Sequence, residues 1–133
     1  MSLNDPVADM LTRVRNAVRV GKPQVDVKAS KVCEGIAIVL KQEGFIEGYD
    51  KIEDATKQGI LRVSLKYSPD GESVIHAIDR TSKPGRRVYA GSKELPLVLG
   101  GMGIVVVSTS KGVFSDKVCR SENIGGEIIC TVN

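Results

Sequence analysis

The segment Ser68-Pro69-Asp70-Gly71 divides the sequence into two parts with different hydrophobic patterns. It is a strong turn signal, because proline fixes one backbone dihedral, aspartate bonds nearby backbone amides and glycine accepts a positive φ. Apolar residues before it recur mostly at helical spacing, whereas those after it form short runs between glycine-rich turns. The sequence therefore predicts an α+β fold of two small domains, an N-terminal domain at residues 1–68 and a β-rich C-terminal domain at residues 69–133.

The predicted N-terminal domain has the order helix, strand, helix, strand, strand. Asp5-Pro6 is expected to begin the first helix, because aspartate caps free amides and proline fits the first helical position. Gly21 is expected to end this helix. Ser30 is expected to cap a second helix, which Gly44 ends. The expected strands are residues 23–27, 45–51 and 61–67.

The predicted C-terminal domain combines strands with short helices. Short helices are expected at residues 92–95 and 116–122, the second capped by Ser115. Residues 100–103 match the GXXG pattern of a KH domain, but a strand follows them where that domain has a helix, so a tight turn is favoured. The expected strands are residues 73–79, 88–89, 104–107 and 127–132.

The sequence contains no motif that indicates catalysis, a metal or a cofactor. Its only histidine, His76, lies in an expected strand, and no GxSxG element surrounds a serine. Gly21-Lys22 follows a helix and precedes proline, so it is not a phosphate-binding Walker A loop. The three cysteines, Cys33, Cys119 and Cys130, are scattered and form no CxxC pair, which favours reduced thiols in a cytosolic protein.

Neither a membrane span nor a targeting peptide is expected. No apolar run approaches the roughly 18 residues that a spanning helix requires. Asp5 and Asp9 interrupt the basic-then-apolar pattern of a signal peptide. These features predict a cytoplasmic protein with no membrane partner.

Charge is distributed unevenly along the chain, although the net charge is only +3. Residues 13–31 contain six Lys or Arg against one acid, and residues 80–93 contain five against none. Residues 43–54 contain five acids against one lysine. This distribution is typical of an anionic partner at the basic zones, although an ordinary mixed surface would also account for it. In the second basic zone the candidate contacts lie in a turn and are Lys83, Arg86 and Arg87.

Residues 108–112, with the sequence STSKG, follow an apolar run and carry an unusual set of functional groups. Short hydroxyls bind sugar hydroxyls, base edges or phosphate oxygens, lysine neutralises a phosphate, and glycine allows close backbone approach. Together they suit the wide, shallow minor groove of RNA. The alternative is a polar hairpin loop in which Ser and Thr bond the backbone.

Four collinear motifs give the chain its resemblance to a known family. STSKG is followed by Asn123-x-Gly125-Gly126-Glu127 and Cys130, and the other three motifs begin at Asp5, Ser30 and Ser82. They read DPVADMLTRVRN, then SK followed by EGFI, then SKPGRRVY. Together they cover essentially the whole chain, which thus resembles the bacterial-type ribosomal protein eight of the small subunit.

This resemblance implies a non-enzymatic protein that binds small-subunit ribosomal RNA. It implies docking on a helix of the rRNA central domain, promotion of platform assembly and a two-domain fold. The implied protein partners are neighbouring small-subunit proteins, namely proteins five and twelve, and many members also repress their own operon by binding its messenger RNA. The acidic zone at residues 43–54 is expected to face basic neighbours in the subunit.

The resemblance also assigns RNA contacts to individual residues. In the C-terminal domain the implied contacts are Ser108, Thr109, Ser110, Lys111, Gly112, Tyr89 and Glu127. In the N-terminal domain they are Thr12, Arg15, Asn16, Lys28, Ser30 and Lys31. The chain departs from the family at the start of the second helix, where Glu34 replaces the usual lysine-rich pattern and weakens the attraction for phosphate.

Overall fold

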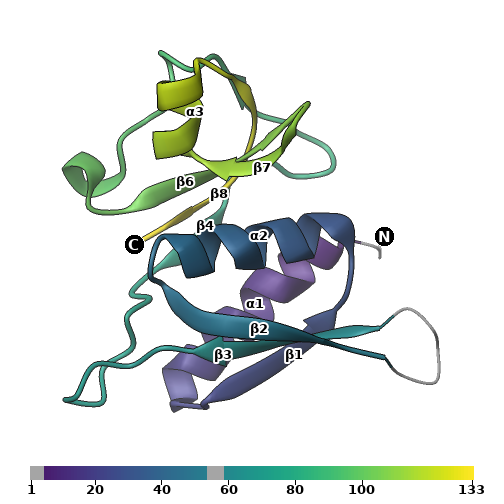
Figure 1. Cartoon of the computed structure of the whole chain (residues 1–133), viewed down its shortest axis with the longest axis vertical. Coiled ribbons are helices and arrows are strands. Elements are labelled where there is room, and N and C mark those ends of the chain that lie inside the picture. The colour runs from purple at the N-terminus through teal and green to yellow at the C-terminus, as the bar shows by residue number, and fades with distance from the viewer. Residues whose placement is uncertain (1–4, 54–58) are drawn as a thin grey trace. The chain divides into compact units, whose positions relative to one another are not determined.

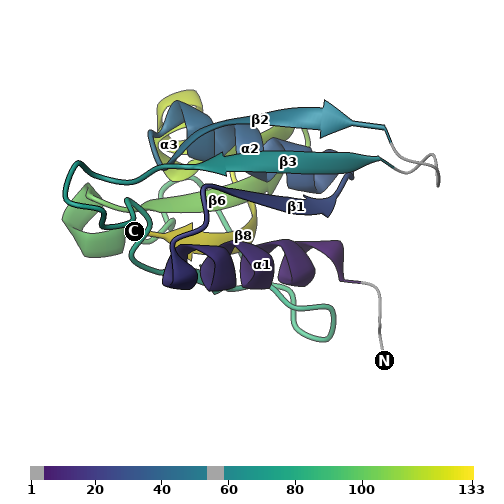
Figure 2. The same cartoon turned by 90° about the horizontal axis from the view of Figure 1, so that it is seen from below.

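The computed structural model of the chain describes residues 5–53 and 59–133. It consists of two compact units, an N-terminal unit (Met1–Ile75) and a C-terminal unit (His76–Asn133). Helices and antiparallel sheets occur together, so the predicted α+β class is confirmed (Figures 1 and 2). The predicted domain boundary between residues 68 and 69 stays a prediction.

The N-terminal unit contains two helices and a three-stranded sheet. Its elements are α1 (Pro6–Val20), β1 (Gln24–Lys28), α2 (Lys31–Gln42), β2 (Ile46–Ile52) and β3 (Ile60–Leu65). The sheet is antiparallel with the order β1-β3-β2. Leu61, Val63 and Leu65 of β3 are buried, while the residues between them are half-buried, so one face of the sheet supplies the core together with apolar residues of α1 and α2. The predicted order of elements in this part is confirmed.

Capping residues at the helix ends lie where the sequence predicts them. The side chains of Asp5, Ser30 and Ser115 each accept a hydrogen bond from an amide three residues later, at 3.1, 3.1 and 3.3 Å. Gly21 caps the end of α1 with φ 76°, and Gly44 follows α2 with φ 83°. Both glycines adopt a left-handed conformation that other residues rarely take, which is why the helices end there.

The C-terminal unit is built around strand β8. Its elements are β4 (Ile78–Arg80), β5 (Tyr89–Ala90), the 3-10 helix η1 (Val98–Gly101), β6 (Ile104–Thr109), β7 (Gly112–Ser115), α3 (Asp116–Glu122) and β8 (Gly126–Val132). β8 pairs with β4 and β5 along one edge and with β6 along the other, and β7 pairs with β6. Every pairing is antiparallel.

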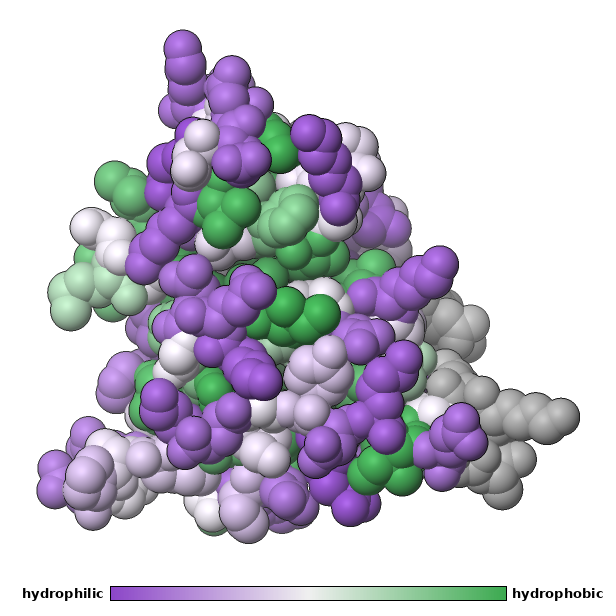
Figure 3. All heavy atoms as spheres, viewed as in Figure 1, coloured by the Kyte–Doolittle hydropathy of each residue, from purple (hydrophilic) through white to green (hydrophobic). Residues whose placement is uncertain are grey.

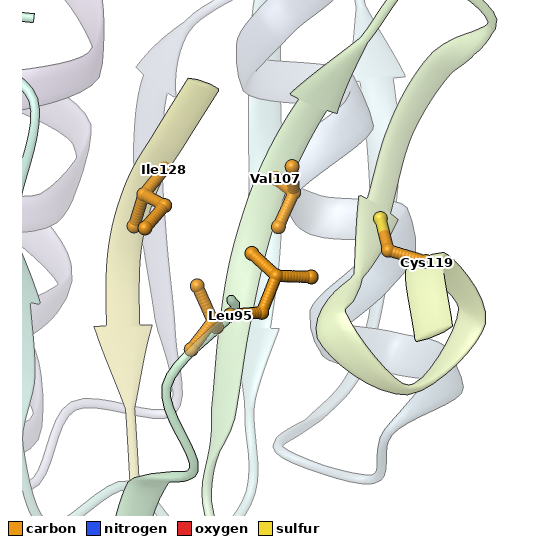
Figure 4. Close-up of a cluster of buried hydrophobic side chains, with 5 residues drawn as sticks. Leu95, Val107, Cys119 and Ile128 are labelled. Carbon is orange, nitrogen blue, oxygen red and sulfur yellow. The ribbon is translucent and has the colours of Figure 1, made fainter. Parts of the chain in front are cut away.

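One face of this sheet packs under α3. The buried cluster consists of Leu95, Val105, Val107, Cys119 and Ile128, of which four are labelled in Figure 4. The three cysteines all lie within the described residues, are buried and form no disulfide. Burial also raises the pKa of the Cys130 thiol to about 12, because a thiolate is poorly solvated in an apolar core.

A buried carboxylate connects α3 to the sheet and to the loop before η1. Asp116 is 1% exposed, and its Oδ1 accepts a hydrogen bond from the Val105 amide at 3.0 Å. Its Oδ2 lies 2.7 Å from Nη1 of Arg120. Arg120 in turn donates to the carbonyl oxygens of Leu95 and Pro96 at 3.2 and 2.8 Å. Asp116 and Arg120 therefore fix three segments relative to one another.

Three expectations for the C-terminal part were wrong or incomplete. The expected strand at residues 73–79 is present only at Ile78–Arg80, because the amides of His76 and Ala77 both bond to the carbonyl of Asn133 and not to a neighbouring strand. Residues 92–95 form no helix; a turn closes between Gly91 and Glu94. Strand β7 was not predicted. It forms because STSKG turns the chain back, so that the residues after the turn pair with β6.

Candidate nucleic-acid interface

The STSKG segment forms the tip of the hairpin between β6 and β7. Ser108 and Thr109 end β6, Ser110 and Lys111 make the turn, and Gly112 begins β7 with φ 133°. The Thr109 hydroxyl donates to the Gly112 carbonyl at 2.8 Å and accepts from the Lys111 amide at 3.1 Å. Thr109 therefore stabilises the turn, as expected for a polar hairpin loop in which Ser and Thr side chains bond the backbone.

Ser110 differs from Thr109 in having no such structural use. It is exposed at the tip, and its hydroxyl has no hydrogen-bond partner within residues 5–53 and 59–133. Lys111 beside it is also exposed. The tip thus presents one hydroxyl and one ammonium group to the solvent, on a turn whose shape is fixed by Thr109.

A row of cross-strand neighbours joins this hairpin to two other predicted contact residues. Tyr89 of β5 pairs with Glu127 of β8, and Glu127 pairs with Ser108 of β6. Residues paired in this way point to the same face of a sheet and lie about 5 Å apart. The structure therefore brings Tyr89, Glu127 and Ser108 together at the base of the hairpin, although they are distant in sequence.

The glycines between α3 and β8 make this register sterically feasible. A Cβ atom on Gly126 would lie 2.3 Å from the Ser108 carbonyl oxygen, and one on Gly125 would lie 2.6 Å from the Ala90 carbonyl oxygen. Asn123 ends α3 in the left-handed conformation with φ 59°. The motif Asn-x-Gly-Gly-Glu thus ends the helix, passes closely between β5 and β6, and places Glu127 in the row.

Charge in the row is balanced by a neighbouring arginine. Nη1 of Arg87 lies 3.0 Å from Oε2 of Glu127, whose side chain is 21% exposed while that of Arg87 is 48% exposed. A pair this exposed contributes little to stability. Its effect is positional, because it holds the guanidinium of Arg87 beside Glu127 and offsets the negative charge of that carboxylate.

The basic loop at residues 83–87 is anchored by a serine that the sequence analysis did not single out. Lys83 and Arg86 form a tight turn with reciprocal backbone hydrogen bonds of 3.0 and 2.8 Å. Ser82 is 0% exposed, and its hydroxyl accepts from the Val88 amide at 2.9 Å and donates to the Val88 carbonyl at 3.3 Å. Serine is usually a surface residue, so nothing in the sequence indicated this burial. Lys83, Arg86 and Arg87 are all exposed.

The predicted N-terminal contacts fall on two sets of elements. Thr12, Arg15 and Asn16 lie on α1, and Thr12 and Asn16 are exposed. Their spacing of three and four residues places them on one face of the helix. The others are Lys28 at the end of β1, the capping residue Ser30, and Lys31 at the start of α2. The Ser30 hydroxyl already accepts a hydrogen bond in the cap, whereas Lys28 and Lys31 are exposed.

Glu34, the acidic departure at the start of α2, is engaged by residues of β2. Its carboxylate accepts a 2.9 Å hydrogen bond from the Tyr49 hydroxyl and lies 3.5 Å from Nζ of Lys51. The hydrogen bond to Glu34 raises the pKa of Tyr49, because the proton is held between the two groups. The negative charge of Glu34 weakens the attraction of this helix start for phosphate, and the positive charge of Lys51 offsets part of that effect.

The acidic zone at residues 43–54 follows the edge strand β2 of the N-terminal sheet. Asp50 pairs in register with Arg62, which pairs on its other side with Asp26. Nε of Arg62 lies 2.9 Å from Oδ1 of Asp26, and this hydrogen bond lowers the pKa of Asp26. Asp54 lies outside the described residues. The sequence alone does not indicate this row of Asp26, Arg62 and Asp50, because strand register decides which charges meet.

None of the helices in residues 5–53 and 59–133 is both long enough and apolar enough to cross a membrane. A family model described as Ribosomal protein S8 matches residues 5–133.

Individual relatives agree with this match over nearly their whole length. The small ribosomal subunit protein uS8 of Clostridioides difficile (strain 630) is 56% identical over 132 residues, which cover 99% of each chain. The protein of the same name from Rhodopirellula baltica is 57% identical over 133 residues, covering 98% of this chain and 99% of the relative. That of Finegoldia magna is 56% identical over 130 residues, 98% of each chain. The resemblance noted in the sequence is confirmed, and the chain belongs to the ribosomal protein S8 family, a family of structural, non-enzymatic proteins of the small ribosomal subunit.

Proposed function

We propose that the chain is a primary rRNA-binding protein that docks on a helix of the central domain of small-subunit rRNA and promotes assembly of the platform. The main binding surface is the hairpin surface, which comprises residues 108–112 together with Tyr89, Glu127 and the basic loop at residues 83–87. The observation that carries this proposal is the register that joins Tyr89, Glu127 and Ser108 beside the exposed tip.

The chemistry of the hairpin surface suits a distorted RNA helix. Ser108 and Ser110 supply short hydroxyls that both donate and accept, which fits the 2′-hydroxyls and base edges of the shallow minor groove. Tyr89 is 69% exposed, so its ring is available for stacking on an unpaired base. Lys111 and the basic loop supply phosphate contacts, which set affinity more than sequence preference.

Each residue of the STSKG tip has a distinct proposed role. Thr109 shapes the turn through its two internal hydrogen bonds, and Gly112 provides the left-handed start of β7. Ser110 makes the recognition contact, because its exposed hydroxyl is not used by the fold. Lys111 anchors the tip to phosphate.

A second RNA contact is proposed on the N-terminal unit. The exposed polar residues Thr12 and Asn16 and the neighbouring Arg15 form one part, and Lys28, Ser30 and Lys31 form the other. Ser30 contributes through its backbone position, since its hydroxyl caps α2. This contact adds affinity that is independent of sequence.

Two further proposals follow from membership of the family, and a third follows from the charge of the acidic zone. The chain represses its own operon by binding a messenger RNA segment that mimics the rRNA site. Its protein neighbours in the cytoplasmic ribosome include small-subunit proteins five and twelve. The exposed acids of β2, among them Asp50, face basic side chains of a neighbour.

The Ser110→Ala variant tests the recognition role. We expect it to weaken binding to a transcript of the central-domain helix by about 1–3 kcal/mol, because the RNA group facing the hydroxyl loses its partner in the interface. A filter-binding titration measures the change. Ser121→Ala, an exposed serine on α3, is the matched control and should bind like the parent chain. Unchanged affinity in both Ser110→Ala and Lys111→Ala would overturn the site.

The Lys31→Ala variant tests the N-terminal contact. We expect it to weaken binding to all RNAs by a similar factor and to reduce the slope of log affinity against log salt by about one, because one phosphate contact is lost. Titrations with the cognate transcript and an unrelated duplex across a salt series measure both effects. A loss confined to the cognate transcript would show that Lys31 has a different role.

A further inference from the structure

A groove of about 430 Å³ lies between strand β7 and helix α3 of the C-terminal unit. Its apolar lining includes Phe114 of β7, Val118 of α3 and Ile124, which are all half-buried. Figure 3 shows green spheres, which mark apolar side chains, between purple ones over the part of the C-terminal unit where Figure 1 draws β7 and α3. The volume lies in the usual range of small-molecule sites. We call this feature the α3 groove.

Charged side chains of opposite sign line the two ends of the α3 groove. Lys111 of the hairpin tip and Lys117 in the first turn of α3 lie toward one end, and Glu122 at the end of α3 lies toward the other. All three residues are exposed. Glu122 comes five residues after Lys117 in the helix, so their Cα atoms lie about 7.5 Å apart along its axis. The groove therefore combines ammonium groups, apolar side chains and a carboxylate in one small site.

The fold holds the walls of the α3 groove in place. Ser115 ends β7 and caps α3, because its hydroxyl oxygen accepts a 3.3 Å hydrogen bond from the Val118 amide. At the other end of the helix the Ile124 amide donates to the Cys119 carbonyl at 2.9 Å. Phe114 packs against the buried cluster that contains Cys119. Because the walls are already ordered, a ligand loses little affinity to the cost of ordering them.

The lining groups match the parts of a single nucleotide. A phosphate group binds the ammonium groups of Lys111 and Lys117. The Phe114 ring and the two aliphatic side chains beside it contact the flat faces of a base. The carboxylate of Glu122 only accepts hydrogen bonds, so it fits the exocyclic amino group of adenine or cytosine and repels the carbonyl oxygen that uracil has in its place. A fatty acid would bind the lysines but would offer the carboxylate no donor.

We propose that the α3 groove binds one nucleoside monophosphate unit whose base carries an exocyclic amino group. The unit comes either from a free nucleotide or from a nucleotide extruded from the bound RNA, and both present the same phosphate and base. Lys111 belongs to the groove and to the hairpin surface, so the two sites are contiguous. The inference deepens the proposed function, and its RNA source rests on that function.

NMR titrations of the full chain with adenosine monophosphate (AMP), uridine monophosphate (UMP) and adenosine test the groove. We expect AMP to shift the methyl signals of Val118 and Ile124. AMP should bind about tenfold more tightly than UMP, because the hydrogen bond to Glu122 is replaced by a repulsive contact in UMP. Adenosine should bind about tenfold more weakly than AMP, because it has no phosphate. Equal affinities for AMP and UMP, or methyl signals that AMP leaves in place, would overturn the proposal.

Two single changes separate the base contact from the phosphate contact. Glu122→Gln adds an amide donor that also suits uracil, so affinities for AMP and UMP should come within about twofold of each other. Lys117→Ala should weaken AMP binding by about fivefold, the loss of one exposed ionic contact, and leave adenosine binding unchanged. The matched control is Lys41→Ala, at an exposed lysine on α2, which should bind all three ligands like the parent chain. An undiminished preference for AMP in Glu122→Gln would contradict the assigned base contact and overturn the proposal.

Addition of the central-domain transcript distinguishes the two sources of the nucleotide. If the RNA supplies it, the transcript alone shifts the methyl signals of Val118 and Ile124, and AMP causes no further change. If the groove takes a free nucleotide, the transcript leaves these signals in place and AMP still shifts them. Failure of the unmodified chain to bind the transcript would count against the proposed RNA site and leave the AMP result standing.

Discussion

Replacing Gly126 by alanine is expected to lower the free energy of unfolding by about 3 kcal/mol, as overpacking at a tight contact does. The added Cβ would lie 2.3 Å from the Ser108 carbonyl oxygen and 3.2 Å from Cα of Thr109. Both are backbone atoms, so no side chain can rotate away, and β6 must move apart from β8. This movement would displace Ser108 and the tip. Affinity for the central-domain transcript should therefore fall by about tenfold or more, which is the loss expected when one hydroxyl contact is broken.

Urea unfolding and filter binding measure the two effects of Gly126→Ala. The matched control is Gly48→Ala in β2, where the nearest atom to an added Cβ is the end of the Lys41 side chain at 3.9 Å. That change should alter stability by less than about 0.5 kcal/mol, the usual range for surface substitutions. If both variants unfolded at the same urea concentration as the parent chain, the close approach of β6 and β8 would be wrong.

Replacing Asp116 by alanine is expected to lower the free energy of unfolding by about 2–3 kcal/mol. The change leaves the buried Val105 amide without an acceptor, which costs roughly 1–3 kcal/mol. It also removes the carboxylate beside Arg120, whose side chain is 31% exposed, so water offsets part of that second loss. Because Arg120 also fixes the loop before β6 through the Pro96 carbonyl, that loop should become easier to cleave by proteases.

Two further variants show whether the buried hydrogen bond of Asp116 is the cause. Asp116→Asn keeps an oxygen acceptor for the Val105 amide, so it should lose less than Asp116→Ala in the same urea titration. Asp79→Ala, at an exposed aspartate on β4, should unfold like the parent chain. Equal losses for all three variants would contradict the assigned role of Asp116.

Local chemistry explains which parts of the fold could be predicted from sequence. A helix start depends on one side chain and the amides that follow it, so Asp5, Ser30 and Ser115 identified their helices correctly. The same holds for Gly21, because the left-handed cap needs only that residue. These interactions span a few residues and are contained in the local sequence.

Strand limits in the C-terminal unit depend on partners that lie far away in the chain. The alternation at residues 73–79 fits a strand, but the amides of His76 and Ala77 share one distant carbonyl, and only Ile78–Arg80 meets β8. The strand β7 has only four residues and follows the turn without a break, so it carries no signal of its own. In both cases tertiary pairing overrides the local pattern.

For the candidate site, the family resemblance suggests the residues, and this stays a prediction, whereas their arrangement could not be predicted from the sequence. The family resemblance pointed to Tyr89, Glu127 and Ser108, and the structure places all three in one row. That row depends on a register shift between β6 and β8, which occurs between Val106 and Val107. A shift of one residue reverses the face on which a side chain lies, and sequence periodicity does not reveal where it occurs.

The central position of β8 sets the order in which the two units can form during synthesis. The N-terminal sheet uses residues 24–65, so all its strands exist well before the second half of the chain has been translated. The C-terminal sheet has β8 at its centre, and β4, β5 and β6 pair with this strand although they precede it in sequence. Translation proceeds at about 5–20 residues per second. The row of Tyr89, Glu127 and Ser108 therefore cannot assemble until residues 126–132 have left the ribosome that makes them, so the last strand to be made completes both the C-terminal sheet and the proposed contact surface.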